Sequence, residues 1–221
     1  MTLKEYQRVA NLYNENEDES TQIGWVFMDM FNMSIDQVMS LNKKQFYKYS
    51  KIVSKRFHNI DKKPFWSPFK FETDALKITF GQFIECQHFM KQGQIDALHL
   101  VGASVWKDKR KHQVKSEILL NTNVRHVLQD ITKFFLSFHE LVDSYKGLFE
   151  TDETEDEPDE LAKPDKPHPF ADQYGWIFSA KQVAEHEGIT LDAAFDLPVV
   201  QAFNDLAYLK AYQSFQKHLN K

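Results

Sequence analysis

The sequence predicts a mainly α-helical protein, and three observations support this fold class. Hydrophobic residues make up 42% of the chain, which is enough to build a core. Nineteen Phe residues stand against only seven Gly and seven Pro, a balance typical of packed helices rather than of a turn-rich β-sandwich. Apolar residues also recur at spacings of three and four along most of the chain, which is the period of an amphipathic helix.

The first part of the chain predicts four short helices that form a compact bundle. Each begins at a residue whose side chain can accept a hydrogen bond from the backbone of the first turn. In chain order, the expected caps are Thr2, Ser20 or Thr21, Ser34 in a capping box with Gln37, and Asn42.

Prolines and alternating aromatic residues mark the stretch from Pro64 to Thr79. This pattern predicts a loop followed by one or two short strands. We therefore expect at most a short β element, near residues 69–78, as the only β structure of the chain.

Helices are expected to resume after this stretch. In order, the sequence predicts a helix opened by a Thr79–Gln82 capping box and stopped by Gly93, a helix from Ile95 to Trp106, a turn over the basic residues 107–115, and a long helix that Asn121 to Asn123 cap and that reaches Leu148.

The segment from Glu150 to His168 divides the chain. Eight carboxylates lie within residues 150–160, and three prolines lie within the whole segment, which has almost no apolar residues. Such a composition cannot bury enough apolar surface to offset the entropy of ordering, so it predicts an extended, solvated linker. The expected organisation is a helical N-terminal module (residues 1–149), an acidic flexible linker (150–168) and a small helical C-terminal module (169–221).

The C-terminal module predicts a helix that Gly188 stops, a short helix capped by Thr190, and a long helix with Pro198 in its first turn. A module of about fifty residues has a small core and is marginal alone. We expect a partner or the N-terminal module to complete it.

Two parts of the sequence resemble each other. Residues 24–27 (GWVF) precede residues 34–41, and residues 175–178 (GWIF) precede residues 190–197. Both predict a helix followed by a hydroxyl-capped turn and another helix. One interpretation is a repeated unit in which Trp25 and Trp176 occupy equivalent places, each packed against the helix that follows its turn. The other is that two capped turns look alike by chance, because no fixed repeat period is present.

No catalytic motif is found, so we expect a protein that is not an enzyme and that holds no cofactor or metal. Glu85 and His88 have the spacing of metal ligands on a helix, but a second such motif is missing, which favours an exposed helix face. Cys86 is expected in the core. The basic run from Lys107 to Lys115 has the charge to hold a phosphate or the acidic linker, but a solvated turn is the favoured interpretation.

The single cysteine excludes an internal disulfide framework, and the N-terminus has no apolar signal region, so we expect a cytoplasmic protein. No apolar run reaches the ~20 residues of a membrane span. The net charge of −5 gives no bulk attraction to nucleic acid. We therefore expect neither a membrane nor a nucleic acid as partner, and a homo-oligomer is left open.

Two groups of residues are candidates for partner binding, because aromatic anchors and amphipathic helix faces dominate protein interfaces. They are Trp25 and Trp176, and the apolar face of the last helix with Val200, Phe203, Leu206 and Tyr212. For any one of the four tryptophans, core packing is the competing interpretation.

The chain resembles the tail assembly chaperones of tailed bacteriophages. The resemblance covers most of the chain through diffuse patterns: the opening MTLKEYQRV, the stretch ITFGQFIECQHFM (78–90), the helix around residues 131–138, and the ending from Gly175 to Tyr212. In that family a helical N-terminal domain is joined through a variable linker to a small C-terminal extension. The N-terminal module here is long for the family.

The resemblance implies a non-enzymatic helper of virion assembly in the host cytoplasm. Such a protein coats the extended tape-measure protein and recruits tail-tube subunits. The alternative is a structural virion protein, such as a connector or tail-completion subunit, because it would also be helical, aromatic-rich and without a catalytic motif. A small enzyme with a metal at Glu85 and His88 is the third class.

Overall fold

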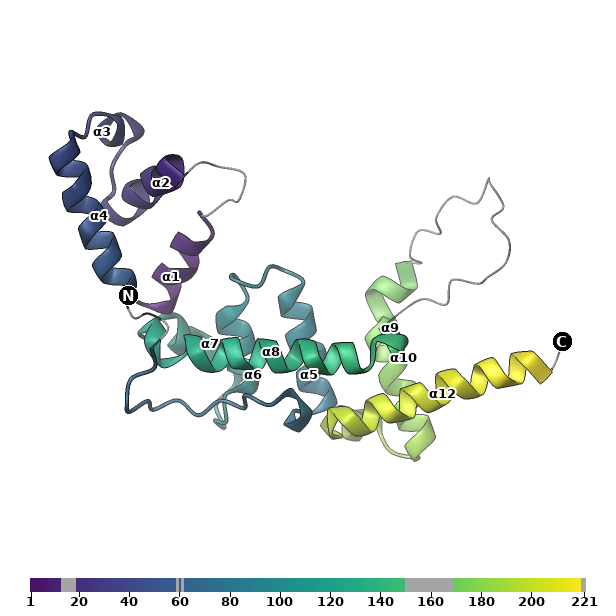
Figure 1. Cartoon of the computed structure of the whole chain (residues 1–221). Helices are drawn as coiled ribbons and strands as arrows, with labels where there is room; N and C mark the ends of the chain where they lie inside the picture. Colours follow the sequence, from purple (N-terminus) through teal and green to yellow (C-terminus); the bar gives the residue numbers. More distant parts are fainter. Residues whose placement is uncertain (13–18, 59, 61, 150–168, 220–221) are drawn as a thin grey trace, which may run out of the picture. The chain divides into compact units, whose positions relative to one another are not determined.

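A computed structural model describes residues 1–12, 19–58, 60, 62–149 and 169–219 (Figure 1). The predicted linker at residues 150–168 lies outside these described residues. Within them the chain is mainly helical and contains no β-strand, which confirms the predicted fold class. The α-helices are α1 (Leu3–Ala10), α2 (Glu19–Phe31), α3 (Ile35–Met39), α4 (Lys43–Phe57), α5 (Phe80–Met90), α6 (Leu98–Val105), α7 (His112–Leu120), α8 (Leu128–Ser144), α9 (Lys146–Phe149), α10 (Pro169–Glu187), α11 (Leu191–Asp196) and α12 (Val199–Leu219). Two short 3-10 helices, η1 (Ala75–Lys77) and η2 (Val124–His126), complete the set.

The chain forms two compact units. The first consists of residues 1–73 and 86–134, and the second of residues 74–85 and 135–221. This division differs from the predicted boundary at residue 149, because α9 and the end of α8 group with the C-terminal helices. The Phe149 ring lies 6.1 Å from the Trp176 ring and 5.7 Å from the Phe203 ring, centroid to centroid. Apolar contacts of this kind join the end of the predicted N-terminal module to the C-terminal one.

In the first unit, the helix caps follow the sequence closely. The side chains of Thr2, Ser34 and Asn42 each accept a hydrogen bond from the backbone three residues on, at 3.2, 3.2 and 3.0 Å. In each case the side chain of that third residue accepts a bond from the cap in return, which completes a capping box. These three predictions are confirmed, and α2 begins at Glu19, one residue before the earlier of its two predicted caps.

The predicted strands do not form in the described residues. The backbone around Phe71 instead makes an isolated antiparallel bridge with Trp106, through bonds from Glu72 N–H to the Val105 carbonyl (2.8 Å) and from Lys107 N–H to the Lys70 carbonyl (2.9 Å). The rings of Phe69 and Phe71 pack on Trp106 at 5.0 and 6.4 Å. The alternating aromatic residues therefore mark an extended chain that buries every second side chain against the end of α6, without a sheet.

Two helical predictions in the first unit need correction. Residues 112–115 were expected in a turn but begin α7, whose first residue, His112, lies against α6 with its Nε2 atom 2.9 Å from the Leu100 carbonyl oxygen. The single long helix expected after Asn123 is instead η2, α8 and α9 in succession. Asn123 caps η2, where its side chain accepts a bond from Arg125 N–H at 3.2 Å.

The second unit is built around a cluster of aromatic rings. Phe80 and Phe83 of α5 and Phe203 of α12 are fully buried. Phe83 stacks on Phe138 at 4.8 Å and meets Phe203 edge to face, also at 4.8 Å. Offset and edge-to-face pairs of this kind stabilise by about 0.5–1.5 kcal/mol beyond the burial of their area. The cluster therefore holds α5, α8 and α12 together.

The predicted order of the C-terminal helices is confirmed. Gly188 ends α10 with a positive φ of 67°, a conformation that favours glycine. The side chain of Thr190 accepts a bond from Ala193 N–H at 3.3 Å and so caps α11. Pro198 directly precedes α12, and the Thr79–Gln82 capping box opens α5 as expected.

The two similar stretches share their order of elements but not their packing. A long helix, a short hydroxyl-capped helix and a long helix occur in both, as α2–α4 and α10–α12. Phe27 is fully buried, whereas the corresponding Phe178 is 49% exposed. The rings that Trp176 contacts include Phe80 and Phe83 of α5, which has no counterpart in the first stretch. The repeat therefore does not extend to the side-chain level.

Candidate functional site

The first half of α12 is fixed within the second unit. Val199 N–H donates to the Ile78 carbonyl at 3.1 Å, and Phe80 N–H donates to the Leu197 carbonyl at 2.8 Å. The Tyr145 hydroxyl donates to Asn204 Oδ1 at 2.8 Å, one turn further along the helix. These bonds and the burial of Phe203 place α12 firmly up to its middle.

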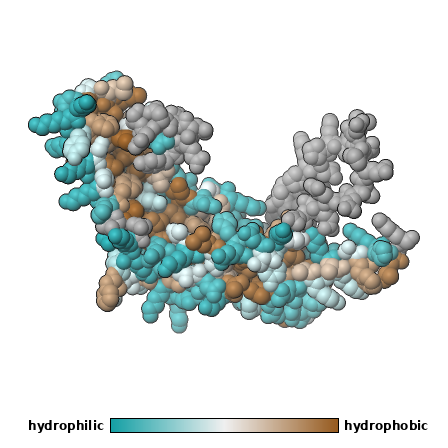
Figure 2. Space-filling model, viewed as in Figure 1, coloured by the Kyte–Doolittle hydropathy of each residue, from teal (hydrophilic) through white to brown (hydrophobic). Residues whose placement is uncertain are grey.

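The second half of α12 carries a stripe of exposed apolar residues, the α12 stripe. Its members, separated by four, three and four residues, are Tyr208, Tyr212, Phe215 and Leu219, which are 56%, 46%, 56% and 66% exposed. This spacing places all four on one face of the helix. The rings of Tyr208 and Tyr212 stack at 6.1 Å with an angle of 7° between their planes. Figure 2 shows apolar surface at this end of α12.

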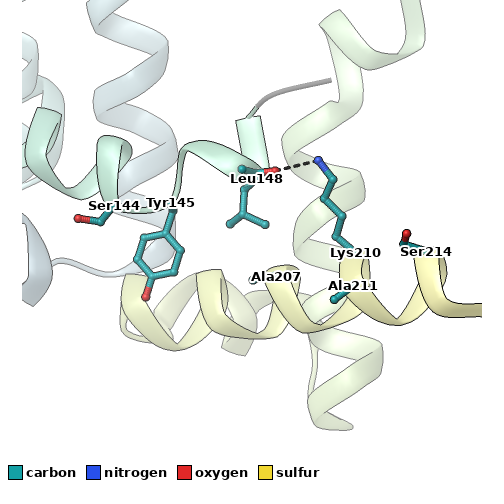
Figure 3. Close-up of a pocket in the computed structure, with 8 residues that line it drawn as sticks. Ser144, Tyr145, Leu148, Ala207, Lys210, Ala211 and Ser214 are labelled. Atoms are coloured by element: carbon teal, nitrogen blue, oxygen red, sulfur yellow. Dashed lines mark hydrogen bonds between the residues drawn. The ribbon is translucent and has the colours of Figure 1, made fainter. Parts of the chain in front are cut away.

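A pocket of about 420 Å³ lies beside the stripe, between α12 and the region where α8 ends and α9 begins (Figure 3). Its walls include Tyr145, Leu148, Ala207 and Ala211, which are mostly apolar. Lys210 closes one side, where its ammonium group donates to the Gly147 carbonyl at 2.8 Å. The pocket and the stripe lie on neighbouring faces of α12. With about 100° of rotation per residue, the mean directions of the two sets of side chains are about 120° apart around the helix axis.

The predicted partner-binding residues occupy different environments. Phe203 is fully buried in its own unit, where Phe80, Phe83, Tyr145 and Phe149 surround it, so it cannot contact a partner in this conformation. Val200 and Leu206 are half-buried, and Tyr212 is exposed as a member of the α12 stripe. The helix face that the sequence singles out is therefore core at one end and surface at the other.

The four tryptophans differ in how far they are buried. Trp106 is a core residue, as expected for any one of them, and Trp66 is exposed. Trp25 and Trp176 are half-buried. Trp176 packs against Phe83 at 5.4 Å and Phe80 at 6.0 Å, which makes it part of the aromatic cluster. A binding role for Trp25 and Trp176 stays a prediction.

Sequence reasoning missed three members of the stripe: Tyr208, Phe215 and Leu219. Helical periodicity placed apolar residues on α12 but could not tell which of its faces the chain itself covers. One signal in the sequence could have indicated the stripe. The last helix continues for about four turns beyond Phe203, and a module of about fifty residues is too small to cover so long a helix along its whole length.

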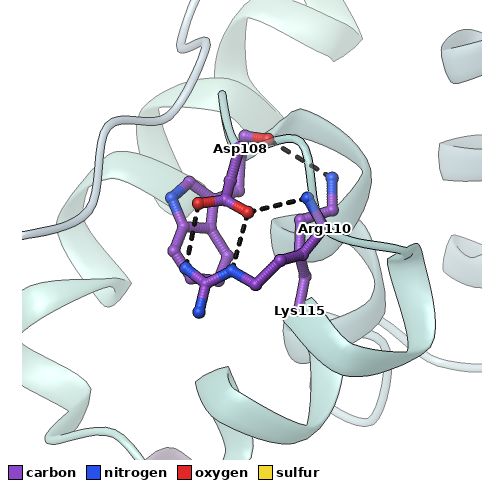
Figure 4. Close-up of polar contacts among 4 residues, drawn as sticks. Asp108, Arg110 and Lys115 are labelled. Atoms are coloured by element: carbon purple, nitrogen blue, oxygen red, sulfur yellow. Dashed lines mark hydrogen bonds and ion pairs between the residues drawn. The ribbon is translucent and has the colours of Figure 1, made fainter.

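Several cations of the basic run are already engaged by their own unit (Figure 4). Arg110 forms a bidentate pair with Asp108, at 2.7 Å from Nε and 2.9 Å from Nη2, and its guanidinium lies 4.7 Å above the Trp106 ring. This guanidinium lowers the pKa of Asp108 to about 2. Lys107 pairs with Glu72 at 2.7 Å, and Lys115 is buried with its ammonium group 3.3 Å from the Trp106 carbonyl oxygen. The run is thus partly structural.

Cys86 and His88 were the remaining candidates for a chemical role. Cys86 is fully buried, which confirms the prediction of a core thiol. His88 lies 3.4 Å from the Gln92 side chain. Across the part of the chain that the structure describes, no three His, Cys, Asp or Glu side chains gather closely enough to hold a metal ion.

One carboxyl group beside the stripe, that of Asp205, has a shifted pKa. Burial, followed by the nearby Glu187 carboxylate, raises the pKa of Asp205, while His186 opposes this shift. The His186 ring in turn lies 5.5 Å from the Tyr208 ring of the stripe. A raised folded-state pKa means that the folded protein binds the proton more tightly, so stability falls as pH rises through that pKa.

We therefore expect Asp205→Asn to raise the melting temperature at pH 7 slightly, because it removes a charge that the fold disfavours. The gain should shrink as the pH is lowered and the wild-type carboxyl takes up its proton. Thermal unfolding of both proteins from pH 4 to 8 checks this. A gain that is the same at every pH would contradict it.

Among the described helices, none has both the length and the apolar composition of a membrane span. Comparisons of this chain with models of protein families, with curated proteins and with solved structures give no match.

Proposed function

We propose that this chain is a non-enzymatic assembly helper of tailed-bacteriophage type, which binds tape-measure and tail-tube proteins in the host cytoplasm while a virion tail is built. The main observation that supports this proposal is the α12 stripe. Contiguous exposed apolar surface is unfavourable in water, and on a folded protein it marks sites of interaction with other proteins. A stripe of four large apolar residues on one helix face fits a partner that supplies an apolar groove or a second helix.

The position of the stripe favours capture of an elongated helical partner. The first half of α12 is held by buried rings and backbone hydrogen bonds, so the second half is presented on a rigid support. A preorganised helix loses little conformational entropy when it binds. The pocket beside the stripe adds a second apolar contact on the neighbouring face. The other compact unit remains available for a second partner, which is the arrangement that an assembly helper needs.

Substitutions on the stripe test the proposal better than truncation does. A chain ending near residue 149 would lose Trp176 and Phe203 from the aromatic cluster, which would unfold the support along with the stripe. The triple variant Tyr212→Ala/Phe215→Ala/Leu219→Ala removes exposed side chains only. We expect it to keep its melting temperature within a few degrees, since surface changes usually alter stability by no more than about 0.5 kcal/mol.

Co-expression of the full chain with the tape-measure and tail-tube proteins, followed by purification of complexes, provides the measurement. The triple variant should bind one of the two partners at least tenfold more weakly and keep the other. Leu136→Ala is the matched control, because Leu136 is an exposed apolar residue of the same unit that lies outside the stripe. Failure of the wild-type chain to bind either protein would refute the proposal. Stoichiometric retention of the chain in purified virions would favour the structural alternative.

A further inference from the structure

Three helices of the first unit, α2, α3 and α4, leave much of their apolar surface uncovered. Neither α3 nor α4 contains a buried residue, although α4 is fifteen residues long and amphipathic. In α2 the buried apolar residues are Val26 and Phe27. Large apolar side chains of α3 and α4 are exposed instead: Ile35, Met39, Phe46, Tyr47 and Ile52. Figure 2 shows the corresponding apolar surface over these helices.

An apolar cavity of about 220 Å³ lies between α2 and α4 and is partly open to solvent. It is lined chiefly by Ile23, Val26 and Phe27 of α2 and by Ser50, Val53 and Phe57 of α4. The share of liquid volume of one water molecule is about 30 Å³, so the cavity has room for a bulky apolar side chain. An open cavity with this lining is not filled favourably by water alone.

The α4 wall of the cavity includes a buried polar atom. The Ser50 Oγ atom is buried and has no hydrogen-bond partner among the described residues. A buried hydroxyl without a partner is unfavourable, so such atoms are rare in protein interiors. The hydroxyl has almost no accessible surface, so it lies behind the cavity lining and is not presented to a bound group.

The charge of α4 is one-sided. The helix carries Lys43, Lys44, Lys48, Lys51, Lys55 and Arg56 and no acidic residue, within a chain whose net charge is −5. No ion pair joins these cations to a carboxylate of the described residues. Lys44, Lys48, Lys51 and Lys55 are separated by four, three and four residues and so share one helix face, the lysine row. Tyr47, which is 71% exposed, lies between that face and the side of Ser50 and Ser54.

We propose that the α2–α4 cavity and the lysine row together bind an acidic peptide segment of another protein. A bulky apolar side chain of that segment occupies the cavity, and flanking carboxylates lie along the lysine row. The row alone would suit a nucleic acid equally well, since phosphate contacts require only cations. The apolar cavity, which suits an apolar side chain, favours the peptide. This site lies in a different unit from the α12 stripe and does not depend on the function proposed above.

Fluorescence anisotropy with synthetic probes tests the site in the full-length protein. The first probe is a labelled twelve-residue peptide of Asp and Glu with one central Phe. Two further peptides replace the Phe with Ala or all acids with their amides, and a twelve-nucleotide thymidine oligomer serves as the polyanion. We expect the Ala peptide to bind at least fivefold more weakly than the Phe peptide, and the amide peptide to bind at least tenfold more weakly.

Two variants assign the effects to the proposed residues. Lys44→Glu/Lys51→Glu/Lys55→Glu should weaken binding of the Phe peptide at least tenfold, whereas Lys133→Glu/Lys146→Glu/Lys181→Glu, with the same change in net charge at exposed sites elsewhere, should not. Val53→Phe fills the cavity from its own wall and should make the Phe and Ala peptides bind equally. Circular dichroism confirms that each variant is folded.

Two results would overturn the proposal. The first is equal binding of the Phe and Ala peptides by the wild-type protein. The second is tighter binding of the thymidine oligomer than of the Phe peptide, unaffected by Val53→Phe, which would make the lysine row a general polyanion surface.

Discussion

Phe203→Ala should destabilise the second unit by about 3–5 kcal/mol, the range measured when a fully buried Phe is truncated. Phe203 is completely inaccessible to solvent, and its ring meets four others, those of Phe80, Phe83, Tyr145 and Phe149, at centroid distances from 4.8 to 6.2 Å. Removal of the ring loses the transfer free energy of its apolar atoms and leaves a cavity that the surrounding rings cannot fill without leaving their own partners.

Phe215→Ala is the matched control for this effect. It makes the same substitution in the same helix, three turns further on, at a side chain that is 56% exposed. Its effect on the free energy of unfolding should stay within about 0.5 kcal/mol. Thermal unfolding followed by circular dichroism should therefore show a melting temperature lowered by about 10 °C or more for Phe203→Ala and nearly unchanged for Phe215→Ala. Equal shifts for both variants would mean that Phe203 is not part of the core.

This pair of residues also shows where sequence reasoning stops. Phe203 and Phe215 both lie on a helix with the same apolar periodicity, and periodicity reports only that a face is apolar. Whether the protein's own chain or a partner covers that face depends on contacts with residues far away in sequence. Phe80 and Phe83 on α5 decide this for Phe203, and no local pattern connects residues 80 and 203.

Local signals, in contrast, were reliable. The caps at Thr2, Ser34, Asn42 and Thr79 were all predicted, those at Ser34 and Thr79 as capping boxes, because a cap is formed within four consecutive residues. Gly188 likewise ends α10 through a property of its own backbone.

The start of α7 was missed for the opposite reason. A run of basic residues resembles a solvated turn, yet Lys115 is buried against the Trp106 carbonyl and His112 contacts α6. Tertiary contacts override the local preference here. The grouping of residues 135–149 with the C-terminal helices likewise depends on tertiary contacts. A segment that suggests a linker does not reveal that the helices on either side of it share one aromatic cluster.

The second large effect is expected at Gly102, where α6 approaches its neighbours closely. A Cβ atom at this position would lie 2.8 Å from Ile131 Cδ1 and 3.1 Å from Leu119 Cδ1, and both of those side chains are fully buried. Gly102→Val should destabilise the first unit by about 1–3 kcal/mol, because overpacking forces buried side chains out of their preferred rotamers. Gly175→Val is the control: apart from its own helix backbone and chain neighbours, no atom of the described residues lies within 4 Å of a Cβ at that position, so its substitution should cost little or stabilise the helix slightly.

A double-mutant cycle separates this crowding from other effects of the added atoms. Ile131→Val alone removes the Cδ1 atom that the new Cβ would meet and should cost about 0.5–1.5 kcal/mol through the space it leaves. The double variant Gly102→Ala/Ile131→Val should lose less free energy of unfolding than the sum of the two single variants, because the added methyl group enters the space that the Ile131 substitution leaves. Unfolding free energies from urea titration of the four proteins give the coupling. Additive costs would mean that α6 and α8 do not pack closely at Gly102, since residues in contact are expected to couple by about 0.5 kcal/mol or more.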